Sequence, residues 1–258
     1  MHKEFSPMQV YQIYFSPTGG VKKAADLLCS AWGAVTEPID LLHHVGPLFF
    51  SEEDLCLIAV PVYGGRVPEA ALRGLRMMKG NAIPTVLLAV YGNRAVDDAL
   101  LELRDEVRAA GFACFAAVSA VAQHSLLPVF GQNRPDEKDA QELTAFAKDI
   151  LHAWEEGKET EPQNLPGHRP YRVYNGVPLK PKITSRCVGC GICARACPVQ
   201  AISTDDPGKP DKSKCISCMH CVSICPENAR RLSRPMLYFA RKKLSDACAE
   251  RKPNALYL

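Results

Sequence analysis

A cysteine pattern that occurs twice, CxxCxxCxxxCP, constrains the last third of this 258-residue chain more than any other feature. The second copy follows the first at an offset of 28 residues. The eight cysteines are Cys187, Cys190, Cys193, Cys197, Cys215, Cys218, Cys221 and Cys225. Three thiolates separated by two residues can wrap around one cubane cluster, whereas the fourth stands beside a proline that ends the turn and points away. The spacing is that of the ligands of two [4Fe-4S] clusters.

The fourth cysteine of each run is expected to reach the cluster of the other run. The first predicted cluster then has the ligands Cys187, Cys190, Cys193 and Cys225, and the second has Cys215, Cys218, Cys221 and Cys197. Because this pairing crosses the internal repeat, metal binding and folding become one event. Two tetrahedral zinc sites are the alternative, since CxxC pairs also hold structural zinc. The third cysteine of each run and the paired Cys-Pro endings favour the clusters.

The other four cysteines, Cys29, Cys56, Cys114 and Cys248, share no spacing, and three of them lie in apolar stretches. They are predicted to be buried free thiols. No hydrophobic stretch approaches the roughly 18 residues that a membrane span needs. The first ten residues, MHKEFSPMQV, lack the apolar core of a secretory signal. We therefore expect a cytoplasmic protein in a reducing cell interior, without a membrane partner.

The charge is divided unevenly along the chain, although the total is only +3. Residues 1–181 contain 17 Lys and Arg against 22 Asp and Glu, which gives −5, and residues 182–258 contain 14 against 6, which gives +8. Two interpretations of this excess stay open: the basic residues balance the negative clusters and solvate a helix, or they form a docking surface for an acidic redox partner. These residues are Arg230, Arg231, Arg234, Arg241, Lys242 and Lys243. No recognised nucleic-acid-binding motif accompanies them, so no nucleic-acid partner is expected.

Apolar runs alternate with helical patterns over the first 157 residues. Strands are predicted at Gln9–Phe15, Val35–Leu41, Leu55–Val60, Thr85–Val90 and Phe112–Ala120, and helices at Val21–Ala31, Glu69–Met78, Val96–Ala110 and Pro135–Glu156. Short, mostly apolar strands joined by helices imply a parallel sheet that is covered on both faces. The predicted fold is therefore α/β, a doubly wound five-stranded parallel sheet with the flavodoxin order 2-1-3-4-5, followed by a small α+β two-cluster domain.

In such a sheet ligands bind beyond the carboxyl ends of the strands, so the loops after the first, third and fourth strands are candidate binding loops. The first loop contains Ser16, Thr18, Gly19, Gly20 and Val21. Its hydroxyls and small residues let backbone amides converge on an anion at the start of a helix, as a phosphate requires. The loop matches neither GxxxxGK[ST] nor GxGxxG, so a monophosphate such as that of FMN is the economical ligand.

The loops after the third and fourth strands suit a flat heterocycle. They contain Pro61, Val62, Tyr63, Gly64 and Gly65, and then Tyr91, Gly92, Asn93 and Arg94. Tyr63 is placed to stack on a ring while the glycines bring backbone amides close to its edge. Each loop alone also reads as a plain turn, but together they indicate a flavin site. His124, after the fifth strand, either contacts the flavin or donates a proton to it on reduction, or it is a structural histidine.

Four segments give a specific resemblance when they are taken together: SPTGG, PVYGGRVP, YGNRAVDDAL and QHS follow the first, third, fourth and fifth strands, ahead of the double cysteine run. Over nearly its whole length the chain resembles the family of single-chain flavodoxin-ferredoxin fusion proteins. The resemblance implies FMN in the first domain, two [4Fe-4S] clusters in the second and low-potential electron transfer. Flavodoxins usually have a third hydroxyl residue where this chain has Val21, so FMN is expected to lose one hydrogen bond, nominally about 0.5 to 1.5 kcal/mol.

The predicted domains are 1–157 for FMN binding, 158–182 as a Pro-rich linker, 183–234 as the ferredoxin domain and 235–258 as a basic C-terminal helix and tail. The linker is expected to be extended and stiff, with Tyr171, Val173 and Tyr174 pinning it against one domain. A pinned linker would fix the distance between the flavin and the clusters.

The predicted function is electron transfer between the clusters and the flavin, in the service of another enzyme, for example a radical-generating iron-sulfur enzyme. Neither domain needs a catalytic acid, base or nucleophile for this. The alternative is an FMN-dependent reductase of a small molecule such as a quinone, for which the short stretch Ser125–Asn133 is the candidate lid. A redox sensor that relays the flavin state to a protein partner is a third hypothesis. Between electron carrier and enzyme the sequence leaves the choice open, as it does the oligomeric state.

Overall fold

The computed structural model of the protein describes residues 9–43, 48, 50–51, 54–157 and 160–258. Most of the N-terminal stretch in which the sequence shows no secretory signal lies outside these residues. None of the helices in the described ranges is long and apolar enough to cross a membrane.

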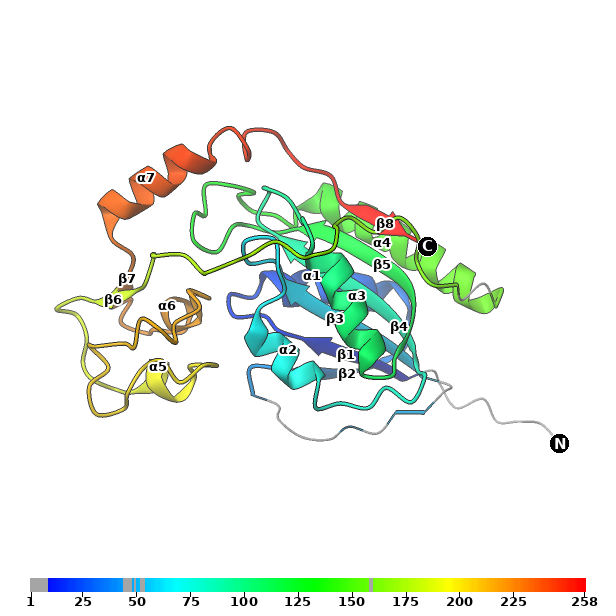
Figure 1. The fold of residues 1–258 in the computed structure, drawn as a ribbon, viewed down its shortest axis with the longest axis horizontal. Coiled ribbons are helices and arrows are strands. Elements are labelled where there is room, and N and C mark those ends of the chain that lie inside the picture. Colours follow the sequence, from blue (N-terminus) through cyan, green and yellow to red (C-terminus); the bar gives the residue numbers. More distant parts are fainter. Residues whose placement is uncertain (1–8, 44–47, 49, 52–53, 158–159) are drawn as a thin grey trace.

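Five parallel strands form the centre of the first domain, in the order β2-β1-β3-β4-β5 (Figure 1). They are β1 (Gln9–Tyr14), β2 (Val35–Asp40), β3 (Leu55–Pro61), β4 (Pro84–Tyr91) and β5 (Ala113–Val121). Every residue of β3 and β4 is buried, because the central strands of a doubly wound sheet are covered on both faces. The predicted α/β class and the order of these five strands are confirmed.

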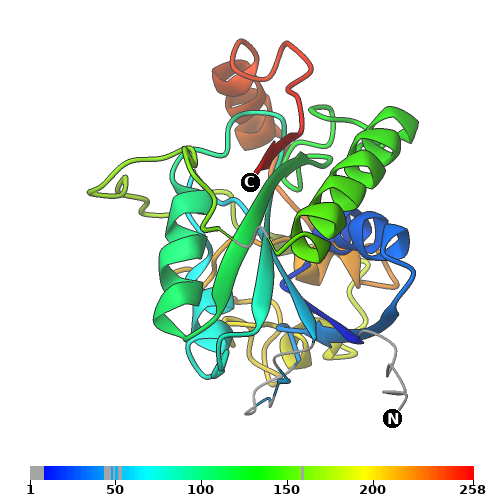
Figure 2. The same ribbon diagram turned by 90° about the vertical axis from the view of Figure 1, so that its right-hand side faces the viewer.

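Helices cover both faces of the sheet, as Figure 2 shows. They are α1 (Gly20–Ala31), α2 (Glu69–Leu75), α3 (Ala99–Ala109) and α4 (Glu137–Glu155). On one face, Leu28 of α1 and Leu143 of α4 belong to the same apolar core. On the other face, Leu72 of α2 and Leu100 of α3 belong to a second core. This winding places the loops that follow β1, β3, β4 and β5 at one edge of the sheet.

Three helices are shorter than the sequence predicts. The helix α4 begins at Glu137, after its N-cap Asp136, rather than at Pro135, and it ends at Glu155. The helix α2 ends at Leu75, and the Met78 amide donates to the Leu75 carbonyl at 3.0 Å in a tighter turn. The helix α3 begins only at Ala99, because Asp97 has a φ of 47°, in the left-handed region that an α-helix excludes.

The sheet has a sixth strand that the sequence does not predict. The strand β8 (Ala255–Tyr257) pairs antiparallel with β5, so the sheet is mixed and six-stranded rather than parallel and five-stranded. Asn254 fixes the start of β8, because its Oδ1 accepts from the Val121 amide and its Nδ2 donates to Asp139, both at 2.9 Å. A strand of three residues shows too little periodicity to be recognised from sequence. The end of the C-terminal tail therefore belongs to the sheet of the first domain.

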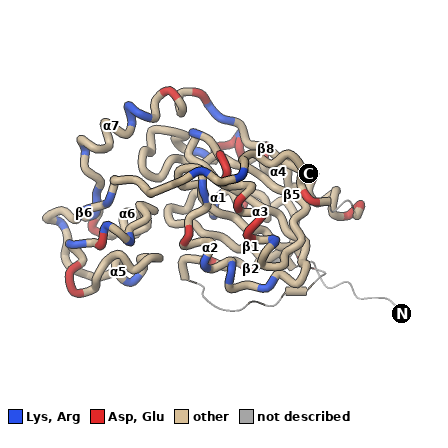
Figure 3. Tube along the Cα trace, viewed as in Figure 1, with Lys and Arg blue, Asp and Glu red and all other residues tan. Residues whose placement is uncertain are grey.

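The cysteine-rich segment forms a small α+β unit (Figure 1). It lies beside the edge of the sheet where the loops after β1, β3, β4 and β5 are found. Its elements are the antiparallel pair β6 (Lys182–Ile183) and β7 (Arg230–Arg231) and the one-turn helices α5 (Ile192–Arg195) and α6 (His220–Ser223). The chain leaves this unit through α7 (Arg234–Leu244), which buries none of its residues. Figure 3 shows Lys and Arg along α7, whose last turn contains Arg241, Lys242 and Lys243.

The linker is attached to the first domain beside α3. The Asp98 carboxylate accepts the Arg172 amide at 2.7 Å, and the Tyr171 hydroxyl donates to Asp105. Val173, in contrast, is 82% exposed. Tyr171 thus pins the linker in the way the sequence predicts, whereas Val173 faces solvent.

Candidate functional site

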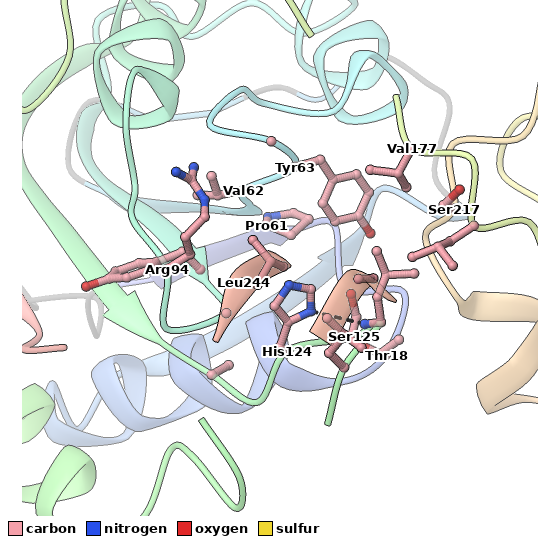
Figure 4. A pocket seen from close by; sticks show the side chains of 18 of the residues that line it. Thr18, Pro61, Val62, Tyr63, Arg94, His124, Ser125, Val177, Ser217 and Leu244 are labelled. Carbon is pink, nitrogen blue, oxygen red and sulfur yellow. Dashed lines mark hydrogen bonds between the residues drawn. The ribbon is translucent and has the colours of Figure 1, made fainter. Parts of the chain in front are cut away.

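A cavity of about 530 Å³ lies beyond the carboxyl ends of β1, β3, β4 and β5. Its walls come from the loops that follow these strands, from the end of the linker, from the segment between Cys215 and Cys218, and from α7. Figure 4 shows Tyr63, Arg94 and His124 around this space. The position is the ligand crevice of a doubly wound sheet, and the volume falls in the range of small-molecule sites.

Most of the predicted cofactor-binding residues meet at this cavity. Those that line it are Ser16, Thr18, Gly20, Val21, Pro61, Val62, Tyr63, Gly64, Gly65, Tyr91, Gly92, Arg94 and His124. Gly19 and Asn93 are not among the lining residues.

The loop after β1 presents the start of a helix to the cavity. Ser16 Oγ accepts the Lys22 amide at 2.9 Å, so this hydroxyl caps the first turn of α1. Gly19 has a φ of 86°, which only glycine adopts without strain, and it shapes the turn from behind the cavity wall. The first amides of a helix have no partner within it and carry the positive end of its dipole. With Thr18 supplying a hydroxyl, the loop fits a phosphate monoester.

The loop after β3 is a tight turn that the linker covers. The Tyr63 amide donates to the Arg66 carbonyl at 2.9 Å, and the Arg66 amide donates back at 3.2 Å. Gly64 and Gly65 between them have φ values of 60° and 87°. A side chain at Gly64 would collide with the ring of Tyr174, so the glycine also admits the linker. Burial raises the pKa of Tyr63 well above its usual value, which keeps the phenol protonated beside the cavity.

Asn93 holds the C-terminal tail instead of facing the cavity. Its Nδ2 donates to the carbonyls of Cys248 at 3.0 Å and Glu250 at 2.9 Å. Its Oδ1 accepts from the Arg134 guanidinium at 3.2 Å and from the Lys252 amide at 3.1 Å. Because both hydrogens and both lone pairs of the side-chain amide are used, none is left for a ligand. The Asn93 side chain therefore has a structural role, and the expected part of Asn93 in cofactor binding stays a prediction for its backbone alone.

His124 lines the cavity as a neutral imidazole. Its Nδ1 accepts the Leu126 amide at 3.2 Å, so the proton is on Nε2. Burial, together with the positive charge of Arg94, lowers the pKa of His124 to about 4. The His124 ring packs against Gly92. A Cβ added at Gly92 would lie 2.8 Å from Cγ of His124. A neutral imidazole can donate a hydrogen bond from Nε2, but it carries no extra proton to transfer at pH 7.

Two smaller cavities lie within the cysteine-rich unit. One is bounded by Cys187, Cys190, Cys193 and Cys225, and the other by Cys197, Cys215, Cys218 and Cys221. These are the two crossed groups that the repeat predicts. In the described ranges no three His, Cys, Asp or Glu side chains are placed to share one metal ion. A [4Fe-4S] cube has a separate iron for each thiolate, so it spreads its ligands more widely than a single ion does.

The two crossing cysteines each accept a backbone hydrogen bond. The Ala201 amide donates to Cys197 Sγ at 3.3 Å, and the Ala229 amide donates to Cys225 Sγ at 3.3 Å. Hydrogen bonds to ligand sulfur stabilise negative charge on it and tune the potential of a cluster. Four thiols around each cavity, with matching amide donors, fit a pair of clusters.

The cysteine-rich unit contacts the loop after β1 directly. Ile216 and Ser217 line both the large cavity and the cavity bounded by Cys215 and Cys218. His220 Nδ1 donates to the Pro17 carbonyl at 2.8 Å, and Ser223 Oγ donates to the same oxygen at 3.0 Å. The sequence indicates no partner for His220, although its position inside a cysteine run places it beside one of the two cysteine groups.

Several lining residues were not identified from the sequence. Met236, Phe239 and Leu244 of α7 close one side of the large cavity, and Phe239 remains 68% exposed. The signal that points to them is the presence of large apolar residues in an otherwise basic C-terminal helix. The four cysteines outside the repeat are buried free thiols, as predicted.

Residues 186–229 match the family model of the 4Fe-4S dicluster domain. A search of the curated proteins finds no match. Among solved structures, a flavodoxin from the domain Archaea is 13% identical and aligns over 57% of this chain and 99% of its own, with a TM-score of 0.42. Flavodoxin 1 from Bacillus cereus is 13% identical over 56% of this chain and 97% of its own, with a TM-score of 0.43.

Rubredoxin oxygen:oxidoreductase from the anaerobe Desulfovibrio gigas is 16% identical, with a TM-score of 0.43. The alignment covers 61% of this chain and 39% of the Desulfovibrio protein. Because these TM-scores are low, the fold is assigned from the order of the five parallel strands alone, which is that of flavodoxin. The chain therefore joins a flavodoxin-like domain to a ferredoxin-type 4Fe-4S domain, the arrangement of a flavodoxin-ferredoxin fusion.

Proposed function

We propose that this protein relays electrons between FMN in the large cavity and two [4Fe-4S] clusters, and exchanges them with another enzyme. The observation that supports this most is the wall formed by Ile216 and Ser217, which separates the large cavity from one group of cysteines. Such a wall makes that group the inner cluster site. Cofactors on its two sides would be close enough for electrons to pass within one molecule.

The loop residues divide the work of holding FMN. Thr18 and the first amides of α1 would bind the phosphate, and Tyr63 and His124 would flank the ring system. When bound, the flavin accepts one or two electrons and each cluster accepts one. The His124 imidazole would donate a hydrogen bond from Nε2, while the apolar side chains of α7 exclude water from one side.

The other cysteine group, which consists of Cys187, Cys190, Cys193 and Cys225, is the outer group and the exchange point for a protein partner. Cys190 is exposed, and Val188 beside it is 69% exposed. Lys and Arg in the last turn of α7 offer positive charge to an acidic partner, and the exposed rings of Tyr238 and Phe239 offer apolar contact area. We infer that this partner is an acidic redox protein.

An anaerobic spectroelectrochemical titration of the reconstituted protein tests the proposal, with EPR spectra of the reduced samples. We expect one FMN and two clusters per chain that reduce in an ordered series. Cys218→Ala should remove a cluster, whereas Cys29→Ala, which removes an equally buried thiol, should remove none. Failure to bind flavin, or zinc in place of iron after anaerobic purification, contradicts the proposal.

One observation favours a second function, the FMN-dependent reduction of a small molecule such as a quinone. Met236, Phe239 and Leu244 give the cavity an apolar wall opposite the loops of the sheet, where a flat apolar substrate would fit. Sustained oxidation of the reduced protein by a soluble quinone, faster than by a protein acceptor, would support this function. Slow turnover of the quinone favours the relay.

A further inference from the structure

At one buried position of the internal repeat, an apolar residue in the first half corresponds to an arginine in the second. In the first run the crossing Cys197 is followed by Ala201 and then by Ile202. In the second run the residue that corresponds to Ile202 is Arg230. Both side chains are buried, with 8% exposure for Ile202 and 3% for Arg230. A full positive charge thus occupies a place where the other half of the repeat has a hydrocarbon side chain.

Arg230 lies between the two cysteine groups. It lines the cavity bounded by Cys187 and Cys190 and also the cavity bounded by Cys215 and Cys218. Its Nη2 donates to the Pro207 carbonyl, but Nε and Nη1 are buried without a hydrogen-bond partner. In the described part of the chain, no carboxylate forms an ion pair with it.

A buried guanidinium without a counterion is expensive, because burial removes its water and nothing replaces it. The two cavities that Arg230 lines are each bounded by four cysteines. His220 also lines one of them, and Glu227, the carboxylate on the lining of the other, is exposed and forms no ion pair with Arg230. If each group holds a [4Fe-4S] cluster, four thiolates give that cluster a net negative charge, and the charge becomes more negative by one unit when the cluster accepts an electron. The unpaired N–H groups of Arg230 then have anions on both sides.

We propose that Arg230 is the internal countercharge of both clusters and raises their reduction potentials. A fixed cation in a low-dielectric interior stabilises the more negative, reduced state of each cluster more than the oxidised state. One electron enters each cluster and no proton is needed, because the charge of Arg230 is permanent. The inference rests on the cluster part of the proposed function and is independent of the flavin.

The test is an EPR-monitored redox titration of the holoprotein with dithionite as the reductant. In Arg230→Ile, which restores the repeat, we expect both clusters to become harder to reduce. At the wild-type midpoint the ratio of oxidised to reduced cluster should rise about tenfold, which corresponds to a shift of about 59 mV for a one-electron couple. Arg230→Lys should stay within about threefold of wild type, because it keeps the charge. Arg231→Ile removes an exposed charge one residue away and should also stay within about threefold.

Unchanged ratios in Arg230→Ile, or equal shifts in Arg230→Ile and Arg231→Ile, overturn the proposal. If Arg230→Ile does not load clusters, Arg230→Gln takes its place as a neutral polar variant. Loss of clusters in both neutral variants but not in Arg230→Lys supports the proposal. Loss of clusters in all three variants overturns it, because the shape of the guanidinium would then matter rather than its charge. If FMN and clusters are reduced in an ordered series but the Arg230 variants have unchanged cluster potentials, this inference is overturned while the proposed electron relay is not.

Discussion

The flavodoxin-like sheet and the cysteine-rich unit reach a defined fold by different means. The sheet buries large hydrocarbon side chains completely, among them Leu57, Leu87 and Leu88. The cysteine-rich unit has a much smaller apolar core, in which the buried residues other than cysteine are Ala194, Ala201, Ile202, Met219 and Ala229. A unit with so little apolar core is expected to need bound clusters for its fold, whereas the sheet has a core large enough to form from its chain alone. Under the proposed function, FMN would bind to a sheet that is already folded, whereas the clusters would hold their own unit together.

Both tryptophans of the chain, Trp32 and Trp154, belong to the first domain. Trp32 is buried and its Nε1 donates to the Ala147 carbonyl at 2.9 Å. Tryptophan fluorescence therefore reports on the sheet, and the visible absorbance of the clusters reports on the other unit.

The largest predicted effect follows from removing iron. Chelation under reducing conditions should unfold residues 182–233 and leave the sheet folded. Hydrogen exchange measures the unfolding of one unit and the persistence of the other. Amides around α5 and α6 should lose their protection completely, while amides of β3 and β4 should keep theirs. Loss of protection in the sheet, or unchanged protection around α5, would break the comparison.

A core truncation tests the opposite half. Leu57→Ala should lower the free energy of unfolding of the first domain by about 2 to 5 kcal/mol, since Leu57 is completely buried. Urea unfolding followed by tryptophan fluorescence gives this value, and cluster absorbance in the native protein should not change. Val173→Ala, at a side chain that is 82% exposed, is the control and should stay within about 0.5 kcal/mol. Cluster loss in Leu57→Ala at low urea would mean that the two units fold as one.

Acid should weaken the sheet domain through His124. Its pKa is lowered to about 4 in the folded protein, against about 6.5 when unfolded, so the unfolded chain binds more protons between these values. The stabilising contribution is complete above pH 6.5 and is lost as the pH falls toward 4. The urea midpoint, followed by tryptophan fluorescence, should drop across this window more steeply in wild type than in His124→Asn. Parallel pH profiles of the two proteins would exclude His124 as the cause.

Much of the fold could be predicted because its signals are local. The apolar runs of β3 and β4 and the fixed spacing of the cysteines are each read within a few neighbouring residues. The roles of Asn93 and His220 depend instead on partners far along the chain, 155 residues away at Cys248 and 203 residues away at Pro17. No periodic pattern encodes such contacts. For the same reason Asn93 was expected at the cavity, and the strand β8 was not expected at all.

The smallest predicted effect concerns the phosphate loop. Val21→Thr adds a hydroxyl at a buried position that lines the cavity, and should tighten FMN binding about 2- to 10-fold, equivalent to about 0.5 to 1.5 kcal/mol. Fluorescence titration of the flavin-free protein measures the dissociation constant, with Val173→Thr as the exposed control. The gain should be the same after iron removal, because a finished sheet holds the loop. A gain that disappears with the iron would show that the cysteine-rich unit shapes the flavin site.

Electrons are proposed to pass between clusters and flavin inside one molecule, across the wall formed by Ile216 and Ser217. The most direct measurement is flash reduction of the clusters in the holoprotein, with flavin absorbance followed over a tenfold range of protein concentration. Transfer within one molecule predicts a rate constant for flavin reduction that is independent of protein concentration. A rate proportional to concentration would contradict it, because electrons would then pass only between molecules.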